Sequence, residues 1–140
     1  MMTSDQALIA VTQTLAKGRE MGLKPLSAIV LDAGGHPLAF HRADGASPGR
    51  YAIAHGKAYG AVMLGMTGSQ QMDRAEAQHY FMTAANGVFG GAVVPVPGGI
   101  LIRDDAGAVI GALGVTGDTS DNDAKAGLAA LAEAGLNGDA

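Results

Sequence analysis

Two segments that lie far apart in the chain each show the pattern of a β-hairpin, and this pair of patterns constrains the fold most strongly. In the first, the runs Ser27–Leu31 and Pro37–Ala43 flank a pair of glycines. In the second, the runs Ile100–Arg103 and Val109–Val115 flank the turn sequence DDAG. Stretches of helical character precede, separate and follow the two hairpins. This order predicts an α+β fold, in which helices cover an antiparallel sheet.

Four helices are expected around these hairpins. The first runs from about Ser4 to about Met21, and Thr3 with Gln6 forms a capping box at its start. The other three are expected at Tyr51–Leu64, from Gly68 or Ser69 to about Ala85, and from Ser120, where Asp123 completes a helix-start motif. One face of the third helix is expected to carry a stripe of side chains: Ala77, Tyr80, Phe81, Ala84 and Val88.

The composition indicates one domain, residues 1–140, whose surface is partly covered by self-association. Apolar residues make up 48% of the chain, charged residues 16%, and glycine occupies 22 positions; an ordinary soluble domain has about a quarter charged residues. A net charge of −4 without a basic stripe argues against a nucleic-acid partner. The absence of cysteine excludes disulfides and cysteine-bound metals. No signal peptide or membrane-length apolar run is visible, so a cytoplasmic protein without a membrane partner is expected.

Two glycines in the second expected helix indicate close packing. Gly56 and Gly60 are four residues apart and therefore lie on one face. Glycine in a helix interior costs up to about 1 kcal/mol relative to alanine. We therefore expect another backbone or subunit to approach this face closely.

The same helix carries the first candidate catalytic residues, Lys57 and His55. Spacing by four places Tyr51, His55 and Tyr59 on one face. A half-buried histidine bonded to a carbonyl and a solvated helix lysine are the alternatives that involve no chemistry. Acid–base catalysis by these two residues is the functional alternative, because burial adjusts a pKa.

Arg42 and Asp44 are candidate ligand-binding residues. Alternation along the strand places them on one face, with His41 on the other. They form either a surface ion pair of small energetic worth or a guanidinium that Asp44 holds at the mouth of a pocket, ready for a carboxylate.

Two further segments are open to a functional and a simpler interpretation. The sequence VPVPGG ends in Gly98 and Gly99, which either form a turn at the sheet edge or offer backbone N–H groups to an anion. The sequence GDTSDND contains Asp121 as a candidate ligand-binding residue. It lacks the glutamate of a calcium loop, and acidic residues that favour a helix start explain it more simply.

The four histidines do not form a metal motif. His36, His41, His55 and His79 include no pair at a spacing of three or four residues, so no dedicated metal site is expected.

Several motifs together resemble the GlcG/HbpS-like family, also described as haem-degrading-domain-like or DUF336. They are AIVLDAGGHPLAFHRADGASPGR, AHGKAYGA, PVPGGILI and DAGAVIGALGVTGDTSDND, and they occur in the expected order over roughly residues 5–135. The resemblance implies a profilin-like α+β sandwich with a central antiparallel sheet of about five strands. It also implies homo-oligomers that are built from dimers and are octameric in some members. Some members bind haem, and Lys57 matches a lysine of the family.

Three functional hypotheses follow. The first is a small-ligand-binding protein of the GlcG/HbpS type that binds haem, with His55, His79 or His41 as the iron ligand. The second is a cofactor-independent enzyme of lyase, isomerase or hydrolase type on a small oxygenated acid or carbonyl compound. It would use Lys57 and His55 as acid and base, and the N–H groups of Gly98 and Gly99 for an oxyanion. The third is an accessory oligomer without chemistry.

Overall fold

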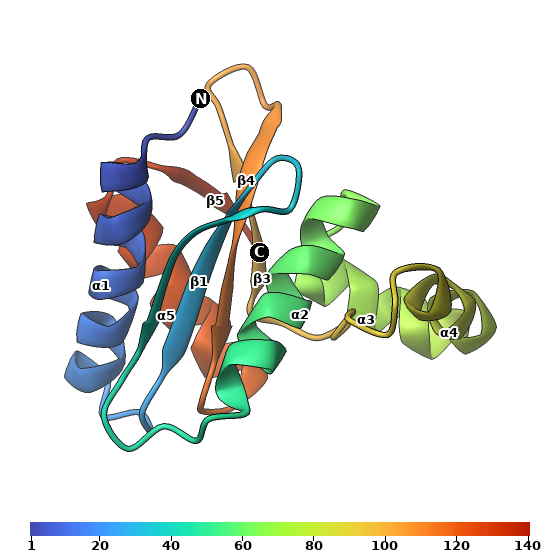
Figure 1. Ribbon diagram of the computed structural model, residues 1–140, viewed down its shortest axis with the longest axis horizontal. Helices are drawn as coiled ribbons and strands as arrows, with labels where there is room; N and C mark the ends of the chain where they lie inside the picture. Colours follow the sequence, from blue (N-terminus) through green and yellow to red (C-terminus); the bar gives the residue numbers. More distant parts are fainter.

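The computed structural model describes residues 1–140, which form five helices and one five-stranded antiparallel sheet (Figure 1). In chain order the elements are α1 (Ser4–Glu20), β1 (Ser27–Asp32), β2 (Pro37–Arg42), α2 (Arg50–Leu64), α3 (Gly68–Ala77), α4 (His79–Val88), β3 (Gly99–Arg103), β4 (Val109–Thr116), α5 (Ser120–Glu133) and β5 (Asn137–Asp139). The strand order is β2-β1-β4-β3-β5. The predicted α+β sandwich, with two hairpins that contribute to one sheet of five strands, is confirmed.

The two hairpins join along their first and last strands. β1 pairs with β4 over its full length, from Ser27 opposite Thr116 to Asp32 opposite Gly111. These central strands are buried on both faces, because helices cover the sheet on both sides. α1 and α5 pack on one face and α2 on the other, which gives three layers (Figure 1).

Strict alternation along the strands divides the core in two. Ala28 and Val30 of β1 face the larger cluster, under α1 and α5, while Ile29 and Leu31 face the smaller cluster, under α2. This period of two is what an extended strand imposes. The fully buried side chains that α2 contributes to the smaller cluster are all alanines, Ala54, Ala58 and Ala61, and Tyr59 and Val62 pack against it partly buried.

The first capping prediction is confirmed and the last is corrected. Thr3 and Gln6 form the expected reciprocal capping box at the start of α1. At α5 the N-cap is Thr119 rather than Ser120, and its hydroxyl accepts the Asn122 N–H at 3.2 Å. Asp123 is therefore not a capping partner, and its carboxylate turns into the protein.

The expected helix from residue 68 to about 85 is in fact two helices. Gln78, with φ −143° and ψ 65°, leaves the helical region and separates α3 from α4. The expected apolar stripe is not buried, since Tyr80 is 62% and Val88 80% exposed, and Met82 and Ala85 face inward instead. α4 packs against α3 and against no other helix or strand, so it projects from the body of the molecule (Figure 1).

No helix has both the length and the apolar character that crossing a bilayer requires.

The close packing predicted for the glycines of α2 is confirmed. A Cβ at Gly56 would collide with the carbonyl oxygen of Ala92 and lie 2.6 Å from a methyl carbon of Val94. The Val94 N–H also donates to the Gly56 carbonyl at 3.2 Å. The Gly/Pro-rich segment before β3 therefore lies directly on the backbone of α2, which only glycine allows here.

Replacing Gly56 by alanine will separate helix propensity from packing. Alanine gains about 1 kcal/mol of propensity in a helix, but the overpacking at this position costs about 1–3 kcal/mol. The variant Gly56→Ala is therefore expected to be less stable to urea, whereas Gly87→Ala in α4, where a Cβ meets nothing within 4 Å, will be as stable as the wild type or more so. Equal shifts of the two urea midpoints would contradict this account.

Candidate functional site

Lys57 and Asp123 form an ion pair in the interior of the protein. Their side chains are only 3% and 1% exposed, and Lys57 Nζ lies 3.2 Å from Asp123 Oδ2. Lys57 comes from the middle of α2 and Asp123 from the first turn of α5. The ammonium also donates to the Val115 carbonyl at 2.9 Å, near the end of β4. Helices on opposite faces of the sheet therefore meet at its end through this pair.

Burial dominates the acid–base properties of both partners. It lowers the pKa of Lys57 and raises the pKa of Asp123, because both charged forms lose hydration. The attraction between the two charges opposes each shift, and Arg50 further lowers the pKa of Lys57. The Arg50 guanidinium itself donates to the Thr116 hydroxyl at 2.8 Å.

Gly98 closes the site above Lys57. It has φ +108°, and its carbonyl accepts the Val115 N–H at 2.9 Å. A Cβ at this position would lie 3.0 Å from Lys57 Nζ and would collide with the Val115 carbonyl oxygen. Lys57 and Gly98 are thus in contact, as the enzyme hypothesis requires. However, Gly98 and Gly99 are both buried, and neither they nor Lys57 line any of the three principal cavities.

The acidic run before α5 forms hydrogen bonds with the loop after α1 and with the first turn of α5. Asp118 accepts hydrogen bonds from the Asn122 side chain at 2.8 Å and from the Lys24 N–H at 3.0 Å, and these bonds lower the pKa of Asp118 to about 2. The Asp118 N–H in turn donates to Asp123 Oδ1 at 2.9 Å. Asp121, the candidate ligand-binding residue of this run, is exposed and makes no side-chain hydrogen bond or ion pair.

Arg42 and Asp44 lie at a different place, at a cavity of about 290 Å³ between the end of α1 and the end of β2. His41 lines the same cavity, although alternation predicted the opposite face, because β2 ends at Arg42 and the chain leaves the sheet there. No ion pair joins Arg42 to Asp44, so the expected pairing is wrong. The two residues line one cavity without forming an ion pair, and Lys57 is not part of this cavity.

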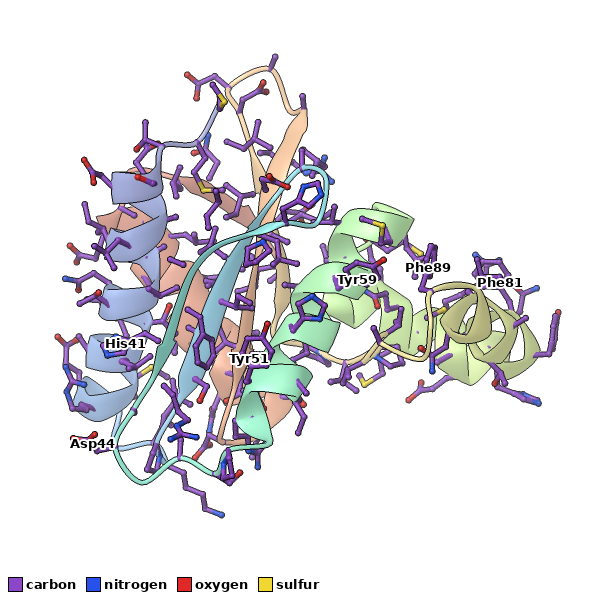
Figure 2. All side chains as sticks on the ribbon, in the orientation of Figure 1. His41, Asp44, Tyr51, Tyr59, Phe81 and Phe89 are labelled. Atoms are coloured by element: carbon purple, nitrogen blue, oxygen red, sulfur yellow. The ribbon has the colours of Figure 1, made fainter.

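His55 lies in a row of aromatic rings along α2, the aromatic row (Phe40, Tyr51, His55, Tyr59 and Phe89; Figure 2). The imidazole is stacked between Tyr51 and Tyr59, with ring centroids 6.2 and 5.3 Å away and interplanar angles of 20° and 22°. Phe40 of β2 and Phe89 after α4 close the ends of the row at nearly right angles. Helical spacing predicts the central three rings, whereas no sequence signal brings in the two phenylalanines.

His79 lies at a third position. It lines a cavity of about 230 Å³ between α3, α4 and the segment before β3, together with Met82, Thr83 and Asn86. The three candidate haem ligands therefore occupy three separate environments.

Removing one partner of the buried ion pair should be costly, and removing both charges should be much less so. Lys57→Met leaves a buried carboxylate without its counter-charge, and we expect a loss of about 3–5 kcal/mol of unfolding free energy. The double variant Lys57→Met/Asp123→Asn should recover most of this loss, because the amide oxygen still accepts the Asp118 N–H. Chemical denaturation of the wild type, both single variants and the double variant measures the coupling; a double variant as unstable as Lys57→Met would contradict it.

The comparisons with known proteins agree with this fold. The chain resembles a double mutant of Streptomyces reticuli HbpS, with 26% identity over 94% of this chain and 86% of that chain and a TM-score of 0.79. Two further structures show the same fold. The PduOC:haem complex has 21% identity over 97% of this chain and 96% of that chain, with a TM-score of 0.85. The Klebsiella pneumoniae protein ORFY, of the DUF336 family, has 24% identity over 96% and 90%, with a TM-score of 0.82.

No curated protein sequence matches the chain. The family model described as "Haem degrading protein HbpS-like" matches residues 2–132, which is nearly the whole sequence. The resemblance inferred from the sequence motifs is therefore confirmed, and the chain belongs to the HbpS-like family.

Proposed function

We propose that the protein binds haem, with His55 as the iron ligand, and that it acts as a homo-oligomer. One observation carries the haem proposal: the half-buried His55 lies at the centre of the aromatic row. The description of the family as haem-degrading and the solved haem complex of PduOC support it.

The stacking of the rings favours His55 as a ligand. Tyr51 and Tyr59 cover the two faces of the imidazole, so access to the ring is through its edge, where the nitrogens are. A neutral imidazole binds iron through such a nitrogen. The flanking aromatic rings provide apolar surface for a porphyrin lying across the row. A bound haem would supply a redox-active iron, and the row would hold it and exclude water from one side.

His41 and His79 have less suitable surroundings. Both are exposed, and their cavities of about 290 and 230 Å³ are too small to enclose a porphyrin. Neither cavity is lined by an aromatic ring other than the histidine itself.

Hemin titration of the histidine variants tests the iron ligand. We expect the Soret band of added hemin to shift with the wild type and with His41→Ala and His79→Ala. With His55→Ala the shift should be lost, or the apparent affinity reduced at least about tenfold, because one coordinate bond is removed. His36→Ala is the matched control, since that imidazole is exposed and bonds only to Asp32. Loss of the shift in His41→Ala or His79→Ala instead of His55→Ala would overturn the assignment.

The proposed self-association rests on α4. This helix projects from the body, contains no Asp, Glu, Lys or Arg, and exposes Tyr80 and Val88. An uncharged helix that exposes large apolar side chains is typical of a subunit interface. A second copy offers the same uncharged surface, and a symmetric dimer uses one patch twice. The dimers and octamers that the family resemblance implies would be built from this contact.

The mass of the protein in solution tests this interface. We expect light scattering to give a multiple of the 14.0 kDa chain mass for the wild type. The double variant Tyr80→Ser/Val88→Ser should shift toward the monomer, because it removes apolar area from the contact. Met21→Ser, which changes an exposed methionine at the end of α1, should leave the mass unchanged. A monomeric wild type, or a double variant with the wild-type mass, would contradict the proposal.

A further inference from the structure

Three cationic side chains converge on the cavity between the end of α1 and the end of β2. Arg19, Lys24 and Arg42 line it, with His41 as a fourth basic group and Asp44 as its one carboxylate. They come from three different segments of the chain: α1, the loop that follows it, and the last residue of β2. Three positive charges against one negative charge make the cavity electropositive, although the chain as a whole carries a net charge of −4.

These three cations are among the four that lack a partner in the protein. The chain has nine Lys and Arg residues. Five of them are engaged by protein groups: Lys17, Arg50, Lys57, Arg74 and Arg103. Arg19, Lys24 and Arg42 make no side-chain hydrogen bond, ion pair or cation–π contact, and Lys125 on α5 is the one other cation without any of these.

The loop that presents Lys24 is held in place by the backbone around Asp118. The Lys24 N–H donates to Asp118 Oδ1 at 3.0 Å, so this carboxylate fixes the main chain of the loop. Gly117, with φ +145°, lies so close to the Pro25 carbonyl that a side chain would collide with it. Asp118 does not line the cavity and forms no ion pair with the Lys24 ammonium. Its hydrogen bonds go to Asn122 and to backbone N–H groups, and the charge of Lys24 adds a weaker attraction.

The remainder of the wall is apolar. Leu15 and Leu26 are buried at the base of the cavity and Leu23 is half-buried beside them. Apolar walls strengthen the attraction between the cations and a bound anion, because they exclude water from part of the site. An inorganic anion held by the cations would leave the apolar part of the wall uncovered. A ligand with both a charged end and an aliphatic body satisfies both parts of the wall.

We propose that this cavity binds a small organic carboxylate. Arg42, with Arg19 and Lys24 beside it, holds the carboxylate, since a guanidinium presents paired donors that match its two oxygens. The aliphatic body lies against Leu15 and Leu26. This site goes beyond the proposed function, because β2 separates it from the aromatic row: Phe40 contacts Tyr51 of α2, while His41 and Asp44 lie on the side of α1 (Figure 2).

Calorimetric titration at low ionic strength tests the proposal with sodium butyrate, sodium succinate and sodium phosphate as probes. We expect at least one of the two carboxylates to bind more tightly than phosphate. Arg42→Gln should weaken that binding by about tenfold or more, because it removes a charge-assisted hydrogen bond. Lys125→Gln is the matched control: it removes the same unit of charge from an unpartnered cation outside the cavity, and it should leave the affinity unchanged.

Three results would overturn the proposal: no heat with either carboxylate, phosphate binding as tightly as they do, or an equal loss in Lys125→Gln. Arg19→Gln provides a second variant, and urea midpoints of all the variants show whether the fold is retained. The Soret shift with hemin should be unchanged in Arg42→Gln. A failure of the carboxylate site would therefore leave the haem proposal standing, and the reverse also holds.

Discussion

The ion pair between Lys57 and Asp123 is the interaction on which the arrangement of the layers depends. α2 and α5 cover opposite faces of the sheet, so the apolar core cannot fix one helix relative to the other directly. Their side chains meet instead at the end of β4, where Lys57 also bonds the Val115 carbonyl. A buried ion pair adds little net stability compared with apolar residues of the same size. Its contribution here is geometric, because the pair joins the middle of α2 to the first turn of α5 at one point.

That placement explains why so many glycines surround the pair. Gly98 leaves room for the Lys57 side chain, and Gly114 of β4 lets the sheet approach the Ala54 carbonyl of α2. In α5, Gly127 makes room for Ile100 and Val115 of the sheet. Each is a position where a Cβ would force two layers apart. The high glycine content, which the composition alone connects with self-association, therefore also serves packing inside the single chain.

Local patterns in the sequence predicted the elements whose signals are local. The two hairpins, the capping box at Thr3 and the packing of Gly56 follow from spacing and turn chemistry, and the structure has all three. The break at Gln78 was missed because neither glycine nor proline marks it. The short strand β5 was missed because three residues including a glycine carry no strand pattern. Thr119 and Ser120 are both good caps, and the sequence does not choose between them.

The candidate sites depend on contacts between distant segments, and here the sequence was less informative. Tyr51, His55 and Tyr59 share one helix, so their spacing predicts the centre of the aromatic row. Lys57 on the same helix could also be chosen as a candidate from the sequence. Its partner Asp123 lies 66 residues further along, and no sequence pattern connects the two. Arg42 was predicted as a candidate ligand-binding residue, whereas Arg19 and Lys24, which line the same cavity from other segments, were not. Strand alternation wrongly predicted the pairing of Arg42 with Asp44, and it also placed His41 on the opposite face from them.

The alanines on the inner side of α2 have a consequence for its outer side. An ordinary surface helix buries its large side chains and exposes small or polar ones, but α2 has the reverse distribution. Alanines face the sheet, whereas Tyr51 is exposed and His55 and Tyr59 are half-buried, and of the three rings only Tyr59 packs against the core. The helix therefore buries little apolar area against the sheet, and much of the apolar area of its large side chains stays accessible. Whatever covers that outer side, whether a flat ligand or another subunit, completes the burial that the isolated chain leaves unfinished.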